Sequence, residues 1–271
     1  MSDGTIRTFH DDPPTIRSCH WTLGSLDIGA NQGFYAFFLA ALDLQVHAFE
    51  IDPTNFLALQ QGTLYDTKEV ADRVCLCPVG LSDAVGRLGS KGCLHEGFLR
   101  KDKAGPILSS TLDCFAHHSN LLQRLLPLSS NDEKKLFLPF VKIDVEGFEM
   151  SVLKGVHNSL CHPSVKIGSL LMEVGPKRWR RASIQLEDGI EEMKLLASHF
   201  TNQFLILKGP GVGHAKSCPL SLIDILSGNS KTPERELHGV QLHRISNPDD
   251  WVTLLTAMEK DNYDCNFWYA S

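Results

Sequence analysis

The sequence predicts a doubly wound α/β fold with a mainly parallel sheet. Three observations predict it: short apolar segments alternate with longer segments of helical periodicity, the first strand runs into a glycine-bounded turn, and no internal repeat interrupts this order. Such alternation places parallel strands side by side and covers both faces of the sheet with helices. A chain of 271 residues is long enough for one such unit, so we expect a single domain.

The first half of the chain supplies three predicted strands, each short, apolar and bounded by turn residues: 25–28, 46–49 and 74–79. Residues 34–42 are apolar on every side, so their helix is expected to be largely buried. Asp52 is expected to cap a helix over residues 53–61, with Pro53 preset for the first turn. The glycine-rich residues 86–105 are expected to form an excursion that contains a short hairpin.

The second half continues the alternation. Its expected strands are 140–144, 167–174, 204–207 and 265–269. Its expected helices follow Thr111 and continue to residue 126, and then span 148–160, 190–200 and 248–260. Residues 129–135 are expected to form a polar loop, and residues 209–247 an irregular stretch.

Composition excludes several functions. The net charge of −6 and pI near 6.0 argue against a nucleic-acid partner, which normally needs a basic face. The longest apolar run is too short to cross a bilayer, and residues 1–12 lack a signal-peptide profile, so we expect no membrane insertion and a cytoplasmic protein. Eight cysteines without a CxxC pair predict reduced, buried thiols, and neither they nor the twelve histidines show metal spacing. The oligomeric state is not predicted.

Three loops predict a ligand site at the carboxyl edge of the sheet. The first strand continues as Asp27-x-Gly29-x-x-x-Gly33, a turn whose glycines let the backbone approach a ligand. Glu50 ends the second strand, where its carboxylate can accept hydrogen bonds from two ribose hydroxyls; the alternative is a helix cap. Ser82 and Asp83 follow the third strand and suit an adenine. The G-x-G-x-x-G spacing of a dinucleotide site is absent, which disfavours a nicotinamide-dependent oxidoreductase.

The segments LDIGANQGFYAFFLAAL, VHAFEIDPTNFLALQQ, VGLSDAVG, STLDCF, FVKIDVEGFEMSVLKG and SLLMEVGP occur in this order and resemble the FkbM family of methyltransferases over roughly residues 23–176. The resemblance implies an S-adenosylmethionine-dependent methyltransferase fold with seven strands, the last antiparallel, and methyl transfer commonly to a hydroxyl oxygen. It divides the single domain 1–271 into an N-terminal extension (1–20), a cofactor-binding core (21–176) and a part that completes the sheet (177–271). The residues that it assigns to the cofactor, with their neighbours in the turn, are Asp27, Gly29, Ala30, Asn31, Gly33, Phe34 and Glu50, with Ser82 and Asp83 near the adenine.

Candidate catalytic residues leave the fourth and fifth predicted strands: Lys142, Asp144, Glu146 and Glu173. Lys142 interrupts a strand that should be covered on both faces, so it needs a partner, and Asp27 or Glu173 is within reach if the fourth strand lies between the first and the fifth. We expect an ion-pair cluster here, with Asp144 or Glu146 facing the acceptor as a general base. The alternative makes Asp144 a helix cap and places Glu146 and Glu149 in the first helical turn.

The basic segment 177–181 has two interpretations. It is either a clamp for an anionic acceptor or a solvated loop, and the solvated loop is favoured. The predicted function is O-methylation of a hydroxyl on a small molecule, sugar or lipid, and no residue is assigned to a metal. A non-catalytic cofactor-binding module of the same fold is the alternative.

Overall fold

The computed structural model describes residues 24–83, 86–88, 107–110, 136–160, 165–207, 218–226, 235–237 and 240–271. Two sheets lie within these ranges. The strands of the main sheet are β1 Ser25–Ile28, β2 Val46–Phe49, β3 Val74–Cys77, β7 Leu136–Ile143, β8 Val165–Val174, β9 Asn202–Leu207, β10 Arg235–Leu237, β11 Val240–Arg244 and β12 Cys265–Ala270. A small second sheet consists of β4 Gly80–Leu81, β6 Ile107–Ser110 and β5 Gly86–Leu88.

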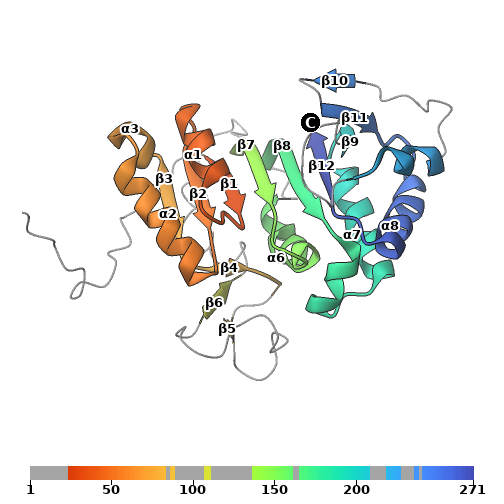
Figure 1. Ribbon diagram of the computed structural model, residues 1–271, viewed down its shortest axis with the longest axis horizontal. Helices are drawn as coiled ribbons and strands as arrows, with labels where there is room; N and C mark the ends of the chain where they lie inside the picture. The colour runs from red at the N-terminus through yellow and green to blue at the C-terminus, as the bar shows by residue number, and fades with distance from the viewer. Residues whose placement is uncertain are drawn as a thin grey trace, which may run out of the picture.

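The main sheet has the order β10-β11-β9-β12-β8-β7-β1-β2-β3 (Figure 1). Strands β3, β2, β1, β7 and β8 pair in parallel, and β12 lies antiparallel between β8 and β9. These seven strands confirm the expected doubly wound sheet with its antiparallel last strand, and β7 lies between β1 and β8 as the Lys142 argument required. Strands β11 and β10 extend the edge beyond β9.

The described helices are α1 Phe34–Ala41, α2 Pro53–Tyr65, α3 Lys68–Ala71, α6 Glu149–Leu160, α7 Leu186–Ser198 and α8 Asp250–Asp261, together with the 3₁₀ helices η1 Pro176–Ala182 and η2 Leu220–Ile225. Helix α1 packs against β1, β2 and β3, whereas α6 packs against β8 and α7 packs against α8. Asp52 caps α2 as expected, because its Oδ1 accepts from the amides of Thr54 and Asn55.

The core occupies both faces of the sheet, which explains the apolar strands. Val46 and Ala48 of β2 pack in a cluster with α1 and α2, whereas Phe49 of the same strand joins the larger cluster around α6, α7 and α8. Side chains on the two faces of one strand therefore pack into two different cores, as expected for a sheet that is covered on both sides.

Three expectations about the elements were wrong. Helix α1 is not largely buried: Phe34 is 76% exposed and Phe38 53%, because a helix on one face of a sheet buries only the stripe that faces it, here Ala36, Leu39 and Ala40. Part of the stretch 209–247 is not irregular, since η2, β10 and β11 lie within it. The third strand ends at Cys77, two residues before its expected end at residue 79.

The expectation of reduced thiols was also wrong. Cys218 and Cys265, 47 residues apart, form a disulfide with a Cα–Cα distance of 4.9 Å, and Cys75 is disulfide-bonded as well. Cys77 is a free, buried thiol. The fold brings Cys218, which precedes η2, next to Cys265, which begins β12. The spacing of these two cysteines in the sequence does not predict their contact.

The helix expected after Thr111 and the polar loop 129–135 lie outside the described residues, as does most of the excursion 86–105. Among the helices that the structure does describe, none is both long and apolar enough to cross a membrane.

Candidate active site

The glycine turn after β1 is fixed by backbone contacts. The amides of Gly29 and Ala30 both donate to the carbonyl oxygen of Phe49 in β2, at 3.0 and 2.9 Å. Gly29, Asn31 and Gly33 all have positive φ angles of 79°, 53° and 95°. A Cβ on Gly29 would lie 1.9 Å from the carbonyl oxygen of Asp144, so only glycine lets this turn approach the exit of β7.

Glu50 joins the glycine turn to the end of β2. Its Oε2 accepts from the amide of Asn31 at 2.6 Å, and its Oε1 accepts from the amide of Asp52 at 2.7 Å. The side chain is buried, and burial raises the pKa of Glu50 despite these two hydrogen bonds. The structure therefore brings Glu50 and the turn together, as expected, and gives Glu50 a role in holding the turn.

The third loop lies against both α6 and the end of β2. Ser82 Oγ donates to Asp83 Oδ1 at 2.9 Å, and the carbonyl oxygen of Ser82 packs so closely on α6 that a Cβ on Gly155 would lie 1.8 Å from it. A Cβ on Gly80 would in turn lie 2.5 Å from the side chain of Ile51, the residue after Glu50. Of the other expected cofactor residues, Ala30 is buried, whereas the exposed ring of Phe34 stacks on that of Phe38.

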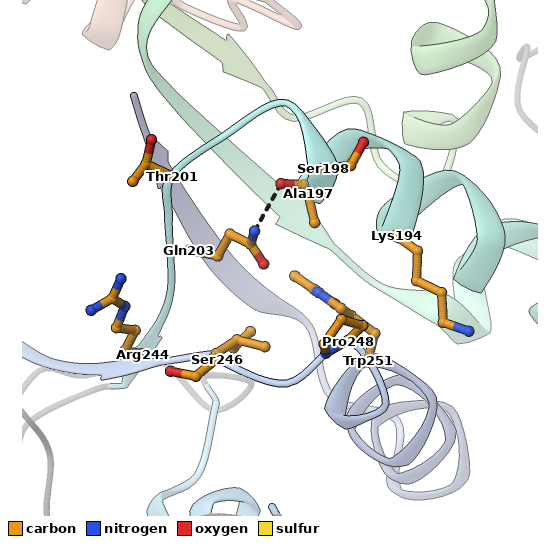
Figure 2. Close-up of a pocket in the computed structure, with 10 residues that line it drawn as sticks. Lys194, Ala197, Ser198, Thr201, Gln203, Arg244, Ser246, Pro248 and Trp251 are labelled. Atoms are coloured by element: carbon orange, nitrogen blue, oxygen red, sulfur yellow. Dashed lines mark hydrogen bonds between the residues drawn. The ribbon is translucent and has the colours of Figure 1, made fainter.

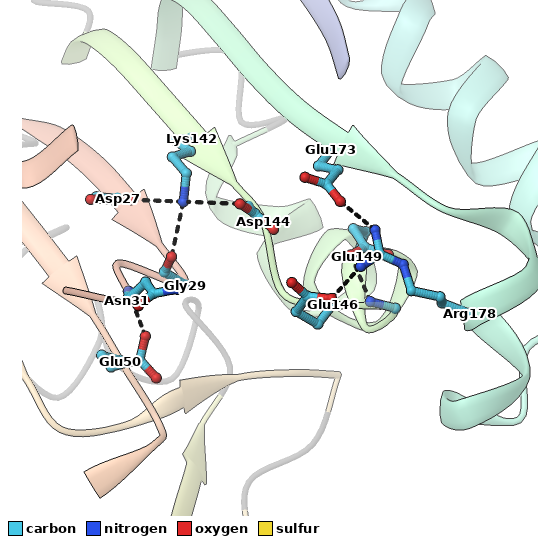
Figure 3. Close-up of polar contacts among 11 residues, drawn as sticks. Asp27, Gly29, Asn31, Glu50, Lys142, Asp144, Glu146, Glu149, Glu173 and Arg178 are labelled. Carbon is cyan, nitrogen blue, oxygen red and sulfur yellow. Dashed lines mark hydrogen bonds and ion pairs between the residues drawn. The ribbon is translucent and has the colours of Figure 1, made fainter. Parts of the chain in front are cut away.

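Lys142 connects the glycine turn to the exit of β7 (Figure 3). In the parallel register it lies opposite Asp27, and its Nζ is 3.3 Å from Asp27 Oδ1, 3.7 Å from Asp144 Oδ2 and 2.9 Å from the Gly29 carbonyl oxygen that it donates to. The ammonium also lies 5.3 Å from the ring centroid of Tyr35. The expected ion pair between Lys142 and Asp27 is confirmed. We call Lys142, Asp27, Asp144 and the Gly29 carbonyl the Lys142 cluster.

The two carboxylates of this cluster differ in access. Asp27 is completely buried, and neither carboxylate oxygen has a hydrogen bond within the part of the chain that is described. The Asp144 side chain is 32% exposed. Burial raises the pKa of both groups, and Lys142 opposes this. Helix α6 begins five residues after Asp144, at Glu149, so the structure disfavours Asp144 as its cap.

Glu146 and Glu173 meet at a different cation. The guanidinium of Arg178, in η1, donates to Glu146 Oε2 and to Glu173 Oε1, and its Nε lies 3.2 Å from Asp264 Oδ1 (Figure 3). We call Arg178, Glu146, Glu173 and Asp264 the Arg178 cluster. Glu173 therefore pairs with Arg178, although the sequence argument offered it to Lys142. Glu146 has a left-handed φ of 55° and precedes α6, which corrects its placement in the first helical turn.

Glu149 is in the first turn of α6, as expected, but it is completely buried. Its Oε1 accepts from the amide of Gly147 at 2.8 Å, and its Oε2 has no partner among the described residues. Burial raises the pKa of Glu149 to about 7. The Glu149 carboxyl thus holds the turn that contains Glu146 and Gly147, and it titrates near neutral pH.

The sequence argument missed Tyr35, Asp264 and the inward role of Arg178. Arg178 was grouped with a solvated basic segment, whereas its side chain is only 12% exposed. Its neighbour Arg180 does behave as expected, since it is 73% exposed and pairs with Glu259. The available signal was the position of Arg178 directly after a buried strand that ends in Glu173 and Val174.

A separate cavity lies at the opposite edge of the sheet, near the start of β9 (Figure 2). Gln203 lies in it and donates to the carbonyl oxygen of Ala197 at 2.8 Å. The other lining residues come from the end of α7, the end of β11 and the start of α8: Lys194, Ser198, Thr201, Arg244, Ile245, Ser246, Pro248 and Trp251. None of the predicted site residues lines it. Among the described residues, no group of three or more histidine, cysteine or acidic side chains has the arrangement of a metal site.

The fold is that of a doubly wound α/β protein. At the carboxyl edge of its sheet, a glycine turn lies beside strand ends that carry acidic residues. The family model of the methyltransferase FkbM domain matches residues 27–200, which is more than half of the chain. The chain belongs to the FkbM methyltransferase family, as the resemblance predicted. The comparison with curated proteins gives no match.

Several solved structures are similar to the chain. One is the methyltransferase FkbM from Methylobacillus flagellatus KT, with 16% identity and a TM-score of 0.44 over 92% of this chain and 44% of that one. This chain therefore spans less than half the length of that structure. Others are the plantazolicin methyltransferase BpumL in complex with SAH (8% identity, TM-score 0.37, 92% and 76% covered) and the glycopeptide N-methyltransferase MtfA complexed with S-adenosyl-L-methionine (11%, 0.32, 90% and 79%).

Proposed function

We propose that the chain uses S-adenosylmethionine to methylate a hydroxyl oxygen of a small molecule, sugar or lipid. The observation that carries this proposal is the position of Lys142, which contacts the Gly29 carbonyl on one side and Asp144 on the other. One side chain thus holds the turn assigned to the cofactor beside the carboxylate assigned to the acceptor.

The residues present fit this cofactor, which would supply a methyl group activated by a sulfonium. Glu50 suits the ribose hydroxyls, because a carboxylate has about four acceptor positions and two are filled by the amides of Asn31 and Asp52. Asp27 is completely buried and paired with Lys142, so it supports the turn through that lysine, and Ser82 with Asp83 suits the adenine. Ala30 and Phe34 complete the assignment at the turn.

The chain's own groups then have two tasks at the acceptor. Alignment of the hydroxyl beside the methyl group contributes up to about 10 kcal/mol. Asp144 accepts the hydroxyl proton, a role worth roughly 10²–10⁴-fold in rate. Its partial exposure gives access to an acceptor, and burial raises its pKa, which makes it a stronger base than an exposed aspartate. Glu146, 66% exposed, and Glu173, 26% exposed, adjoin it, and Lys142 balances the charge of Asp27 and Asp144.

The charge of the site favours a neutral acceptor. The cations in its interior, Lys142 and Arg178, already pair with carboxylates, and Arg180 pairs with Glu259 on the surface. A phosphate that bound Lys142 or Arg178 would have to displace one of these carboxylates. This disfavours the anionic clamp that segment 177–181 suggested, and it supports an uncharged hydroxyl compound without a nucleic-acid or membrane partner.

The proposal is tested by replacing Asp144 with Asn and following transfer of a labelled methyl group to panels of sugars, lipids, phenols and amines. Turnover is expected to fall roughly 10²–10⁴-fold while the melting temperature and the affinity for S-adenosylhomocysteine stay unchanged. The matched control is Asp249→Asn, which changes an exposed aspartate at the start of α8 and should leave turnover intact.

Each other outcome has a defined meaning. A parallel loss of stability in Asp144→Asn would assign the residue a structural role. Binding of S-adenosylhomocysteine without transfer to any acceptor would favour the binding module, and transfer to amines alone would overturn the hydroxyl assignment. Thermal stabilisation by NAD instead of S-adenosylhomocysteine would overturn the cofactor.

Two further expectations belong to the proposal. The whole chain is treated as one domain with the parts 1–20, 21–176 and 177–271, supported by β9 and β12 entering the same sheet as β1. The cytoplasmic location stays a prediction, and the Cys218–Cys265 disulfide is a reason to test it, since disulfides are more usual in oxidising compartments.

A further inference from the structure

Arg178 receives carboxylates from three separate segments of the chain. Glu146 lies in the loop after β7, Glu173 lies in β8, and Asp264 directly precedes β12. Each carboxylate meets a different nitrogen of the guanidinium, Nη1, Nη2 and Nε respectively. The planar fork of an arginine suits such a junction, which a lysine cannot reproduce.

The backbone around Arg178 is shaped to admit this side chain. A Cβ on Gly175 would lie 2.5 Å from Arg178 Nε and 2.3 Å from Asp264 Oδ1. A Cβ on Gly147, which has a φ of 107°, would lie 2.7 Å from the carbonyl oxygen of Arg178. Two loops on different strands thus lack side chains where Arg178 passes, unlike the surroundings of the exposed Arg180.

We propose that Arg178 is a positioning residue of the methyl-transfer site, which fixes Glu146 and Glu173 beside Asp144 and compensates their charge there. This inference rests on the proposed function of Asp144 as the base. Arg178 acts through its carboxylate partners and is not assigned a contact with the acceptor.

The sign of the effect follows from the charges that surround Asp144. Glu146 raises the pKa of Asp144 and Arg178 lowers it, whereas Asp144 and Glu146 raise the pKa of the neighbouring Glu173. The groups that face this carboxylate from β1, α1, β7, its exit loop, α6, β8 and η1 are Asp27, Tyr35, Lys142, Glu146, Glu149, Glu173 and Arg178. Without the guanidinium, the neighbouring carboxylates are uncompensated and favour the protonated form of Asp144.

The test compares Arg178→Met, Arg178→Lys and Arg180→Met. In ligand-free protein, the carboxyl carbon of Asp144 is followed by NMR through a pH titration, with Asp144→Asn for assignment. Arg178→Met is expected to move the midpoint upward by about one unit or more. Arg178→Lys should recover part of that shift, and Arg180→Met should leave the midpoint unchanged. The low-pH limb of kcat should move by the same amount and in the same direction, with the affinity for S-adenosylhomocysteine within twofold.

A folded Arg178→Met variant with the parental midpoint would overturn the proposal, as would an equal shift in Arg180→Met. If Arg178→Met does not fold, Glu173→Gln provides the second test. It removes a negative neighbour, so the Asp144 midpoint should move downward, and an unchanged midpoint would refute the arrangement. Because the titration needs no turnover, it separates failure of this inference from failure of the proposed activity.

Discussion

The two halves of the proposed site, one assigned to the cofactor and one to the acceptor, are built by different means. The cofactor half is a backbone structure, in which the amides of Gly29 and Ala30 bond to β2 and the Asn31 amide bonds to Glu50. The acceptor half is a side-chain structure, in which Arg178 joins carboxylates from three segments that are distant in sequence. A turn specified by local residues and a cluster specified by tertiary contacts therefore tolerate different changes.

Adding one methyl group to each half is expected to have very different effects on stability. In Gly29→Ala the new Cβ would meet the backbone carbonyl oxygen of Asp144 at 1.9 Å, and neither strand can withdraw without breaking the sheet. We expect a loss of more than about 4 kcal/mol in the free energy of unfolding. In Gly147→Ala the nearest atom is the carbonyl oxygen of Arg178 at 2.7 Å, in η1, outside the sheet, so we expect a loss of about 1–3 kcal/mol.

Chemical denaturation of the two variants measures both losses. The parent chain supplies the reference, and calorimetry with S-adenosylhomocysteine reports whether the half assigned to the cofactor still binds. Gly147→Ala should keep its affinity for that ligand. Equal losses of stability would show that the loop before α6 is as rigid as the turn after β1.

The same distinction explains what the sequence could predict. The glycine turn, Glu50 and the capping by Asp52 follow from residues close in sequence, and the structure places them as expected. Lys142 was identified because a charge inside a buried strand needs a partner, and the sheet order then selected Asp27. The fold class was accessible for the same reason, whereas the place of the fourth strand between the first and the fifth followed from the family resemblance.

The remaining features depend on contacts between distant segments. In the sequence, Arg178 is one of several neighbouring basic residues. Only the fold distinguishes it, because it brings carboxylates from β8, from the residue before β12 and from the loop after β7 to its guanidinium. Cys218 and Cys265 likewise meet only through the packing of η2 beside the start of β12. Strands β10 and β11 have apolar patterns too short to distinguish from a loop.

The junction between the halves is tested by Lys142→Met. This change leaves the fully buried Asp27 beside Asp144 without a compensating cation, and breaking such a pair costs about 3–5 kcal/mol. The pKa of Asp27 is already raised by burial, and loss of Lys142 raises it further. Because Asp27 can take up a proton at low pH, the loss of stability should be smaller at pH 5 than at pH 8.

Urea denaturation at both pH values gives the measurement, and the double variant Asp27→Asn/Lys142→Met is the control, since it removes the orphaned charge. The double variant should recover a substantial part of the lost stability at pH 8. A loss independent of pH in the single variant would mean that packing of the lysine stem, not charge, is what Lys142 contributes.

A pH-dependent effect specific to the loop before α6 comes from Glu149. The pKa of this buried carboxyl is about 7, above its ordinary value of 4.5, so the folded chain holds a proton that the unfolded chain releases. Its contribution is therefore present below pH 4.5 and is lost as the pH rises through 7, a change on the order of 3 kcal/mol. Glu149→Gln keeps an oxygen for the Gly147 amide but has no proton to lose.

Between pH 4.5 and 7.5 we therefore expect the parent to lose on the order of 3 kcal/mol of unfolding free energy that Glu149→Gln does not lose. Glu187→Gln is the matched control, because Glu187 also occupies the first turn of a helix, α7, but is exposed. If the curves of both variants ran parallel to the parent's, the partnerless Oε2 of Glu149 would have to be charged and solvated, and the loop before α6 would be open to water.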